Sequence, residues 1–187
     1  LNGGNFASDI GTGSGQITGK KIVITGEIDM SQFADMEGRK DIIVTGIGTK
    51  VTGNVLNFGE VTELNLLGNL TLDFVSISCA EGFVINTNGY AFTVSENYDS
   101  FYYIADHTTG QQIYSAFPSI TVGSDTGHSA VSLDSGHFAN IGVGGSEAVS
   151  GNSTIRISGG VHEAVYSGVA DGFSSIVNGN IYTKISG

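Results

Sequence analysis

The chain has 187 residues, enough for one domain with a buried core, and its 40% hydrophobic content excludes a disordered chain. Its 29 glycines follow no three-residue period, which excludes collagen. Seven Lys and Arg against 18 Asp and Glu give a net charge of −11. Because this charge repels phosphate, we expect no nucleic-acid partner. No apolar run approaches the ~18 residues that cross a bilayer, so we expect no membrane insertion.

Short β-branched runs that end in glycine recur along the chain and predict strands. The signature returns after about twenty residues, whereas the strands of an antiparallel meander would return every 8–12 residues. One main strand per repeat of this length is typical of a solenoid. The Asn-Gly pairs at 88–89 and 178–179 also suit hairpin turns, so antiparallel pairs stay open. The main runs are 22–26, 42–46, 64–68, 120–123, 155–159 and 181–187.

The runs also predict which side chains stack inside the coils. In a parallel solenoid each strand bonds to the equivalent strand of the next coil, so inward residues form rows. We align the glycines that end the runs, where a glycine would permit a sharp corner. The predicted rows are Ile24, Val44 and Leu66, and beside them Ile22, Ile42 and Leu64.

A brief helix is predicted from Asp29 to Gly38. Met30, Phe33 and Met36 are spaced by three, which places them on one side of a helix. Asp29 or Ser31 is the expected N-cap, and Gly38 is the expected stop.

The segment 96–118 holds a concentration of aromatic residues and predicts a loop or hairpin inserted into one coil. Such insertions are where solenoids usually acquire binding surfaces. Tyrosine combines apolar area with a polar tip, so these rings could contact sugar or a protein partner. Packing of the same rings onto the side of the coil is the alternative. The candidate ligand-binding residues are Tyr98, Tyr102, Tyr103 and Tyr114.

The phrase Asp-x-Gly-His occurs twice, nine residues apart. Asp125, His128, Asp134 and His137 offer oxygen and nitrogen ligands that could bind a metal. The alternative is two turns, in which Asp bonds the backbone and Gly takes a positive φ. We favour the turns, because an intervening strand would separate the two phrases by roughly 15 Å.

An enzyme of this shape would need a catalytic set, and we find none to assign. The aspartates are dispersed, whereas glycoside hydrolysis needs two carboxyl groups close together. The chain has two arginines that could be considered as a catalytic base, Arg39 and Arg156. Alternation along 155–157 predicts that Arg156 points outward, where a solvated side chain is a simpler interpretation than a catalytic base. A polyanionic substrate would also meet the charge of −11.

Three phrases carry a resemblance: LNLLGNLTLD at 64–73, INTNGYAFTV at 85–94 and GNSTIRISGG at 151–160. They resemble the pectate-lyase-like β-helix regions of large, adhesin-like cell-surface proteins of Gram-positive bacteria. The resemblance covers about two thirds of the chain, in pattern and without a diagnostic motif. It implies an all-β, right-handed parallel β-helix and an extracellular or cell-surface location, and it assigns no catalytic residue.

From these observations we expect residues 1–187 to form one solenoid domain, a fragment of a longer repetitive surface protein. The expected function is a non-enzymatic surface module, adhesin-like or scaffolding, whose insertion contacts glycan or protein. Two alternatives stay open: a carbohydrate-active lyase or hydrolase, and a fibre subunit that self-associates through open solenoid ends. We expect no cofactor, with Ca²⁺ left open because the chain is acidic.

Overall fold

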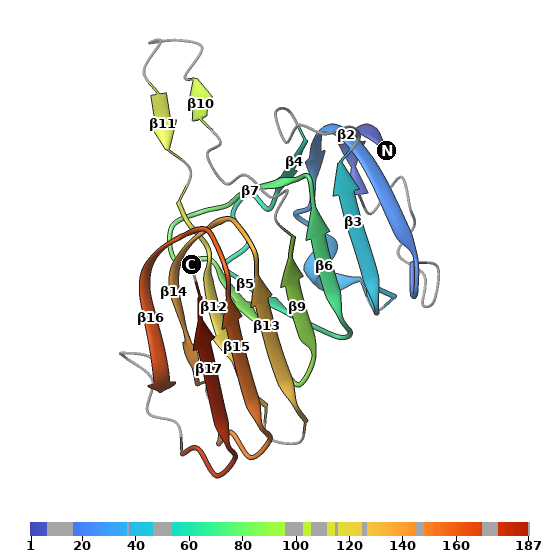
Figure 1. Ribbon diagram of the computed structural model, residues 1–187. Helices are drawn as coiled ribbons and strands as arrows, with labels where there is room; N and C mark the ends of the chain where they lie inside the picture. Colours follow the sequence, from blue (N-terminus) through green and yellow to red (C-terminus); the bar gives the residue numbers. More distant parts are fainter. Residues whose placement is uncertain are drawn as a thin grey trace.

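The computed structural model describes residues 1–6, 17–36, 38–46, 54–95, 103–105, 112–114, 116–124, 127–144, 148–169 and 176–186. This part of the chain is an all-β parallel solenoid of about six turns, as the sequence predicts. Figure 1 shows its strands lying side by side in chain order from the N-terminal to the C-terminal coils. No helix among the described residues has the length and apolar character needed to cross a bilayer.

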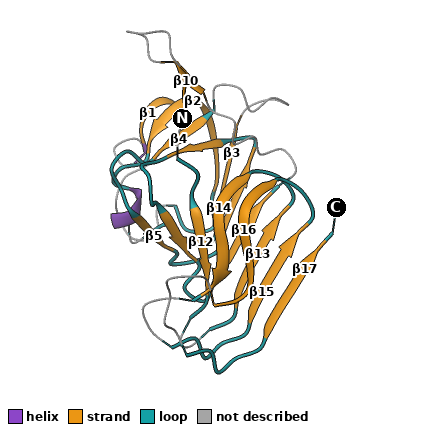
Figure 2. Ribbon diagram, turned by 90° about the vertical axis from the view of Figure 1, so that its left-hand side faces the viewer, coloured by secondary structure: helices purple, strands orange, loops and turns teal. Residues whose placement is uncertain are grey.

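Three faces make up the coils. The main face runs in the order β2 (Lys21–Asp29), β3 (Ile42–Gly46), β6 (Leu70–Asp73), β9 (Ala91–Val94), β13 (Ser129–Leu133), β15 (Ser153–Ile157) and β17 (Ile181–Ile185). The second face consists of β1 (Asn2–Asn5), the last residues of β2, β4 (Val55–Asn57) and β7 (Ser76–Ser78). The third face, visible in Figure 2, runs in the order β5 (Glu63–Asn65), β8 (Val84–Asn86), β12 (Ser119–Val122), β14 (His137–Val143) and β16 (Val161–Val169).

All neighbouring strands in these faces are parallel, so the faces contain none of the antiparallel hairpins that the sequence left open. The exception is the pair β10 (Tyr103–Ala105) and β11 (Gln112–Tyr114), which is antiparallel. It lies within the predicted insertion at 96–118 and projects beyond the stacked coils in Figure 1.

The inward rows exist, but their predicted alignment is wrong. Ile22 pairs with Val44, not with Ile42, and Leu64 belongs to the third face, where it pairs with Ile85. On the main face Val44 continues the row to Leu72. The main-face row is Ile22, Val44, Leu72, Val94, Leu133, Ile157 and Ile185, and the third-face row is Leu64, Ile85, Ile120, Ile141 and Val165.

The misalignment arose because the glycines at a fixed position precede most main-face strands, although β3 also ends in a glycine, Gly46. A glycine stands two residues before the start of β6, β9, β13, β15 and β17. At these corners the backbones of successive coils approach so closely that a side chain has no room. A Cβ on Gly151 would lie 1.4 Å from the carbonyl oxygen of Gly127, and one on Gly179 would lie 2.0 Å from the carbonyl oxygen of Gly151. The Asn-Gly pairs at 88–89 and 178–179 are therefore solenoid corners.

The predicted helix over Asp29 to Gly38 is a single 3-10 turn, η1 (Phe33–Asp35). Asp29 still belongs to β2, and its Oδ1 accepts a hydrogen bond from the Ser31 backbone N–H at 2.9 Å. The N-cap is Gln32, which makes no capping bond, and the extended backbone of Met36 ends the turn. Met30, Phe33 and Met36, which the prediction placed on one side of a helix, are all buried.

A column of phenylalanine rings fills the corner of the N-terminal coils. Phe33 lies 5.1 Å from Phe6 and 6.3 Å from Phe58, both edge-to-face, and Phe58 lies 4.9 Å from Phe83. Each coil in this region thus contributes one buried ring. Such contacts add to the burial of apolar area, which is the main stabilising term of the fold.

Candidate functional site

Two of the four predicted tyrosines lie on the strands of the projecting hairpin. Tyr103 begins β10 and Tyr114 ends β11, and the two are Cα partners across the hairpin. Tyr98 and Tyr102 lie outside the described residues. The hairpin is inserted between β9 and β12, at the place where the two preceding coils carry β4 and β7. The assignment of a ligand to these tyrosines stays a prediction.

The two Asp-x-Gly-His phrases lie at opposite ends of one strand. His128 immediately precedes β13, whereas Asp134 and His137 flank the turn between β13 and β14. The His128 ring is exposed, and its Nδ1 accepts a hydrogen bond from the Asn152 backbone N–H at 3.2 Å. Asp125 lies outside the described residues. Within the part of the chain that the structure describes, no three His, Cys, Asp or Glu side chains are grouped to hold a metal ion.

His137 joins the base of the insertion to the coil. Its ring stacks on Phe117 with 3.4 Å between centroids and 11° between planes, and its Nε2 lies 3.9 Å from Glu163 Oε1. Burial lowers the pKa of His137; the Glu163 carboxylate partly offsets this, and His162 adds to it. A neutral imidazole stacked on a phenyl ring is a packing element of the coil, and the assignment of a metal to His137 stays a prediction.

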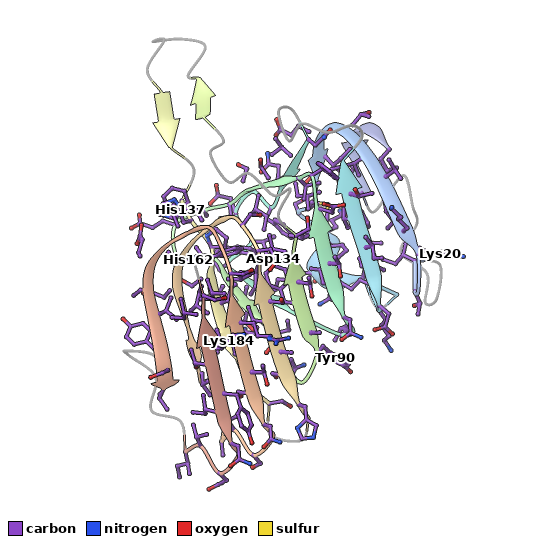
Figure 3. All side chains as sticks on the ribbon, viewed as in Figure 1. Lys20, Tyr90, Asp134, His137, His162 and Lys184 are labelled. Atoms are coloured by element: carbon purple, nitrogen blue, oxygen red, sulfur yellow. The ribbon has the colours of Figure 1, made fainter. Side chains whose placement is uncertain are left out.

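His162 occupies the next coil, on β16, and repeats this pattern (Figure 3). Its ring lies 5.9 Å from Phe138, and its Nε2 is 3.1 Å from the Gly159 carbonyl oxygen. Burial lowers the pKa of His162, and the contact with Gly159 opposes that shift. The two histidines therefore pack against phenyl rings, His137 against Phe117 just before β12 and His162 against Phe138 on β14.

The outward side of the main face forms a second candidate site, built from residues that lie far apart in the sequence. Alternate residues of each strand point away from the core and form rows, as the inward residues do. One row starts at Lys21 on β2 and ends at Arg156 on β15 and Lys184 on β17. The full row is Lys21, Ile43, Thr71, Thr93, Ser132, Arg156 and Lys184.

A shallow groove of about 210 Å³ lies over the last three strands of this face. We call it the C-terminal groove; Asp134 and Lys184, two of its residues, are labelled in Figure 3. Asp134 Oδ1 accepts a hydrogen bond from the Ser158 hydroxyl. The polar side chains that line the groove are Ser132, Asp134, Arg156, Ser158, Lys184 and Ser186.

The two arginines of the chain play opposite parts. Arg39 is buried: its guanidinium donates to the carbonyl oxygens of Met36 at 3.1 Å and Asn65 at 2.8 Å, and lies over the Phe33 ring. Arg156 is exposed, as predicted, and its Cα partner on the next strand is Lys184. Among the described residues, neither Arg156 nor Lys184 has a carboxylate oxygen within 4.0 Å of its side-chain nitrogens.

The sequence could have shown this cation pair, because aligning the glycines that end the runs 155–159 and 181–187 also pairs residue 156 with residue 184. Arg156 and Lys184 are 28 residues apart and belong to predicted strands whose alternation was recognised. Their adjacency depends on aligning the two strands at their first residues, Ser153 and Ile181.

Comparison of the chain with models of known protein families, with curated proteins and with solved structures finds no match.

Proposed function

We propose that this chain is a non-enzymatic, extracellular surface module, adhesin-like or scaffolding, that contacts glycan or protein through its projecting hairpin. The observation that supports the proposal is the position of β10 and β11. The two strands pair antiparallel with each other and extend beyond the coils. In the chain they are inserted between β9 of the main face and β12 of the third face. The likeness to Gram-positive surface proteins, noted above for 64–73, 85–94 and 151–160, is in keeping with this location.

The body of the solenoid suits such a role. Because every coil bonds to its neighbours through parallel strands, the stack is a stiff support along its length. An insertion on such a support changes one surface while the inward rows remain intact. The hairpin can therefore differ in sequence without changing the fold.

The experiment is a comparison of binding with and without the hairpin aromatics. We expect the double substitution Tyr103→Ala with Tyr114→Ala to weaken binding to glycan arrays or extracellular matrix proteins by about tenfold or more. Tyr90→Ala is the matched control, because Tyr90 is a tyrosine 38% exposed at a coil corner away from the hairpin (Figure 3). Unchanged binding in the double variant, or equal loss in the control, would contradict the proposal.

A carbohydrate-active enzyme is the second candidate, and the C-terminal groove is the observation that favours it. The groove places Asp134, Arg156 and Lys184 on one surface. Incubation of the chain with uronic-acid polysaccharides, with and without Ca²⁺, would separate the candidates. Shortened chains or new unsaturated ends would establish the enzyme and defeat the non-enzymatic proposal.

A self-assembling fibre subunit is the third candidate. In the last described coil several apolar side chains are exposed, among them Ile176 at 68%, Tyr182 at 58% and Ile185 at 63%. Light scattering over a concentration series tests this candidate. A constant monomer mass at high concentration would count against it.

A further inference from the structure

We propose that the C-terminal groove binds an acidic saccharide, whose carboxylate or sulfate ester lies between Arg156 and Lys184. This contact is separate from the hairpin and does not depend on the function proposed for it. It assigns a ligand class to a surface for which the sequence predicted only a solvated arginine.

The first argument is electrostatic. The Cα atoms of Arg156 and Lys184 are direct partners on adjacent strands, which lie about 4.8 Å apart. Two like charges at such a cross-strand position destabilise the sheet unless an opposite charge accompanies them. No described carboxylate supplies it within 4.0 Å, although the chain has 18 acidic residues and only seven Lys and Arg. A bound anion would complete the arrangement.

The second argument is the chemistry around the two cations. Ser132, Ser158 and Ser186 line the same groove and can donate to or accept from sugar hydroxyls. The Asp134 carboxylate lies beside them, hydrogen bonded to Ser158, and offers further acceptor capacity. A cation pair bordered by hydroxyls and one carboxylate matches a ring that carries both an anionic group and hydroxyls.

The third argument is an exposed ring on the same side of the sheet. Tyr182 is two residues before Lys184 on β17 and pairs with Thr154, so it shares the outward side with Lys184. It is 58% exposed. An exposed phenol two residues from Lys184 on the same side of the strand can stack on the sugar next to the anionic one, because its ring has an apolar face and a polar tip.

The charge of the whole molecule limits the ligand further. At −11, the chain repels a densely charged polyanion such as a nucleic acid. Two cations suit one anionic group at a time. The ligand class is therefore an oligosaccharide in which acidic and neutral sugars alternate.

The test is calorimetric titration of the whole chain with a hexasaccharide of alternating glucuronic acid and N-acetylglucosamine. Its carboxyl-reduced form is the neutral comparison, a sulfated analogue tests the second source of the anion, and hexaglutamate tests an acidic peptide. We expect Arg156→Gln and Lys184→Gln each to raise the Kd by roughly tenfold or more, the range for hydrogen bonds to charged groups. Tyr182→Ala should raise it about threefold to tenfold.

Lys21→Gln is the matched control, because Lys21 lies in the same outward row at the opposite end of the main face and outside the groove. All four positions are exposed, so the variants should fold, and circular dichroism checks this. Tighter binding of the sulfated probe, lost in the same two Gln variants, supports the groove and assigns the anion to sulfate.

Three results would overturn the proposal. They are equal binding of the carboxyl-reduced probe, unchanged affinity in both Gln variants, and no binding of any saccharide at millimolar concentration. Tighter binding of hexaglutamate would replace the saccharide with an acidic protein partner. Loss of glycan binding with the hairpin tyrosines alone, and not with the groove variants, would sustain the proposed function and reject this one.

Discussion

The coils before the hairpin close through three strands, as in β3–β4–β5 and β6–β7–β8, whereas the coils after it close through β13–β14 and β15–β16. In the earlier coils the corner between the second and third faces is filled by the column of Phe33, Phe58 and Phe83. Phe92, on β9 just before the hairpin, meets Phe138, on β14 in the first later coil, edge-to-face at 6.2 Å. The main and third faces are the two that both halves share.

The difference teaches that the second face is dispensable to the solenoid. Its place in the coil of β9 is taken by the hairpin, and the chain beyond it still continues both remaining faces. Bulky rings fill a wide corner only before the hairpin, whereas glycines permit close corners in both halves, at Gly68 as at Gly151. Each of these features can be tested by substitution.

The largest effect is expected in the aromatic column. Phe58→Ala removes a buried ring that contacts rings on both sides, and such changes lower the free energy of unfolding by about 3–5 kcal/mol. Ile43→Ala in the same coil is the control, because Ile43 is 40% exposed. Chemical denaturation measures both. Hydrogen exchange should show the earlier coils opening while the later coils stay protected; uniform loss of protection would contradict two separable halves.

The glycine corner of the later coils is the next test. Gly151→Ala would place a methyl group 1.4 Å from the Gly127 carbonyl oxygen, so the backbone must shift. Overpacking of this kind costs about 1–3 kcal/mol or more, measured by chemical denaturation. Gly168→Ala on β16 is the matched control, since no atom lies within 4 Å of its added Cβ. Equal stability of the two variants would show that the corner is not close-packed.

A smaller, pH-dependent effect is expected at His137 and His162, which belong to the first and second coils after the hairpin. Burial lowers the pKa of both rings below the ordinary value of 6.5, so between the two values the unfolded chain binds more protons than the folded chain. Their contribution to stability is complete above about pH 6.5 and is lost as the pH falls through the folded pKa values.

The measurement is the free energy of unfolding from about pH 7 to about pH 5, a range that precedes most carboxylate titration. We expect it to decrease, and to decrease less in His162→Phe. His128→Gln, at an exposed histidine, should keep the wild-type slope. A slope that is the same in all three proteins would assign the pH dependence to other groups.

The smallest expected effect is on the reactivity of Cys79, which lies where the coils before the hairpin meet the insertion. Cys79 is buried, its Sγ donates to the Ala116 carbonyl oxygen at 3.3 Å, and burial raises its pKa to about 12. The thiol should therefore remain protonated and unreactive toward a thiol reagent at about pH 8, and react after unfolding. Rapid labelling of the native chain would mean that the coil opens where the insertion ends.

Much of the fold could be read from the sequence because strand alternation is a local property. Whether Ile22 and Ile24 face inward, or Arg156 outward, depends on the two-residue period of the strand itself, and all three predictions are correct. A second local pattern, the threefold spacing of Met30, Phe33 and Met36, predicted a helix that is only a single turn, and all three side chains are buried.

What the tertiary structure decided is which strands stack on which. The spacing of glycines suggested one alignment, but close approach between the backbones of successive coils, as at Gly127 and Gly151, selected another. Register between distant strands follows from contacts across a corner, and no local pattern contains them. The pairing of Arg156 with Lys184 is an exception, since the glycines at 159 and 187 align these two strands in the observed register. The groove above the pair became visible only once the coils were stacked, because it is formed by side chains of three successive coils.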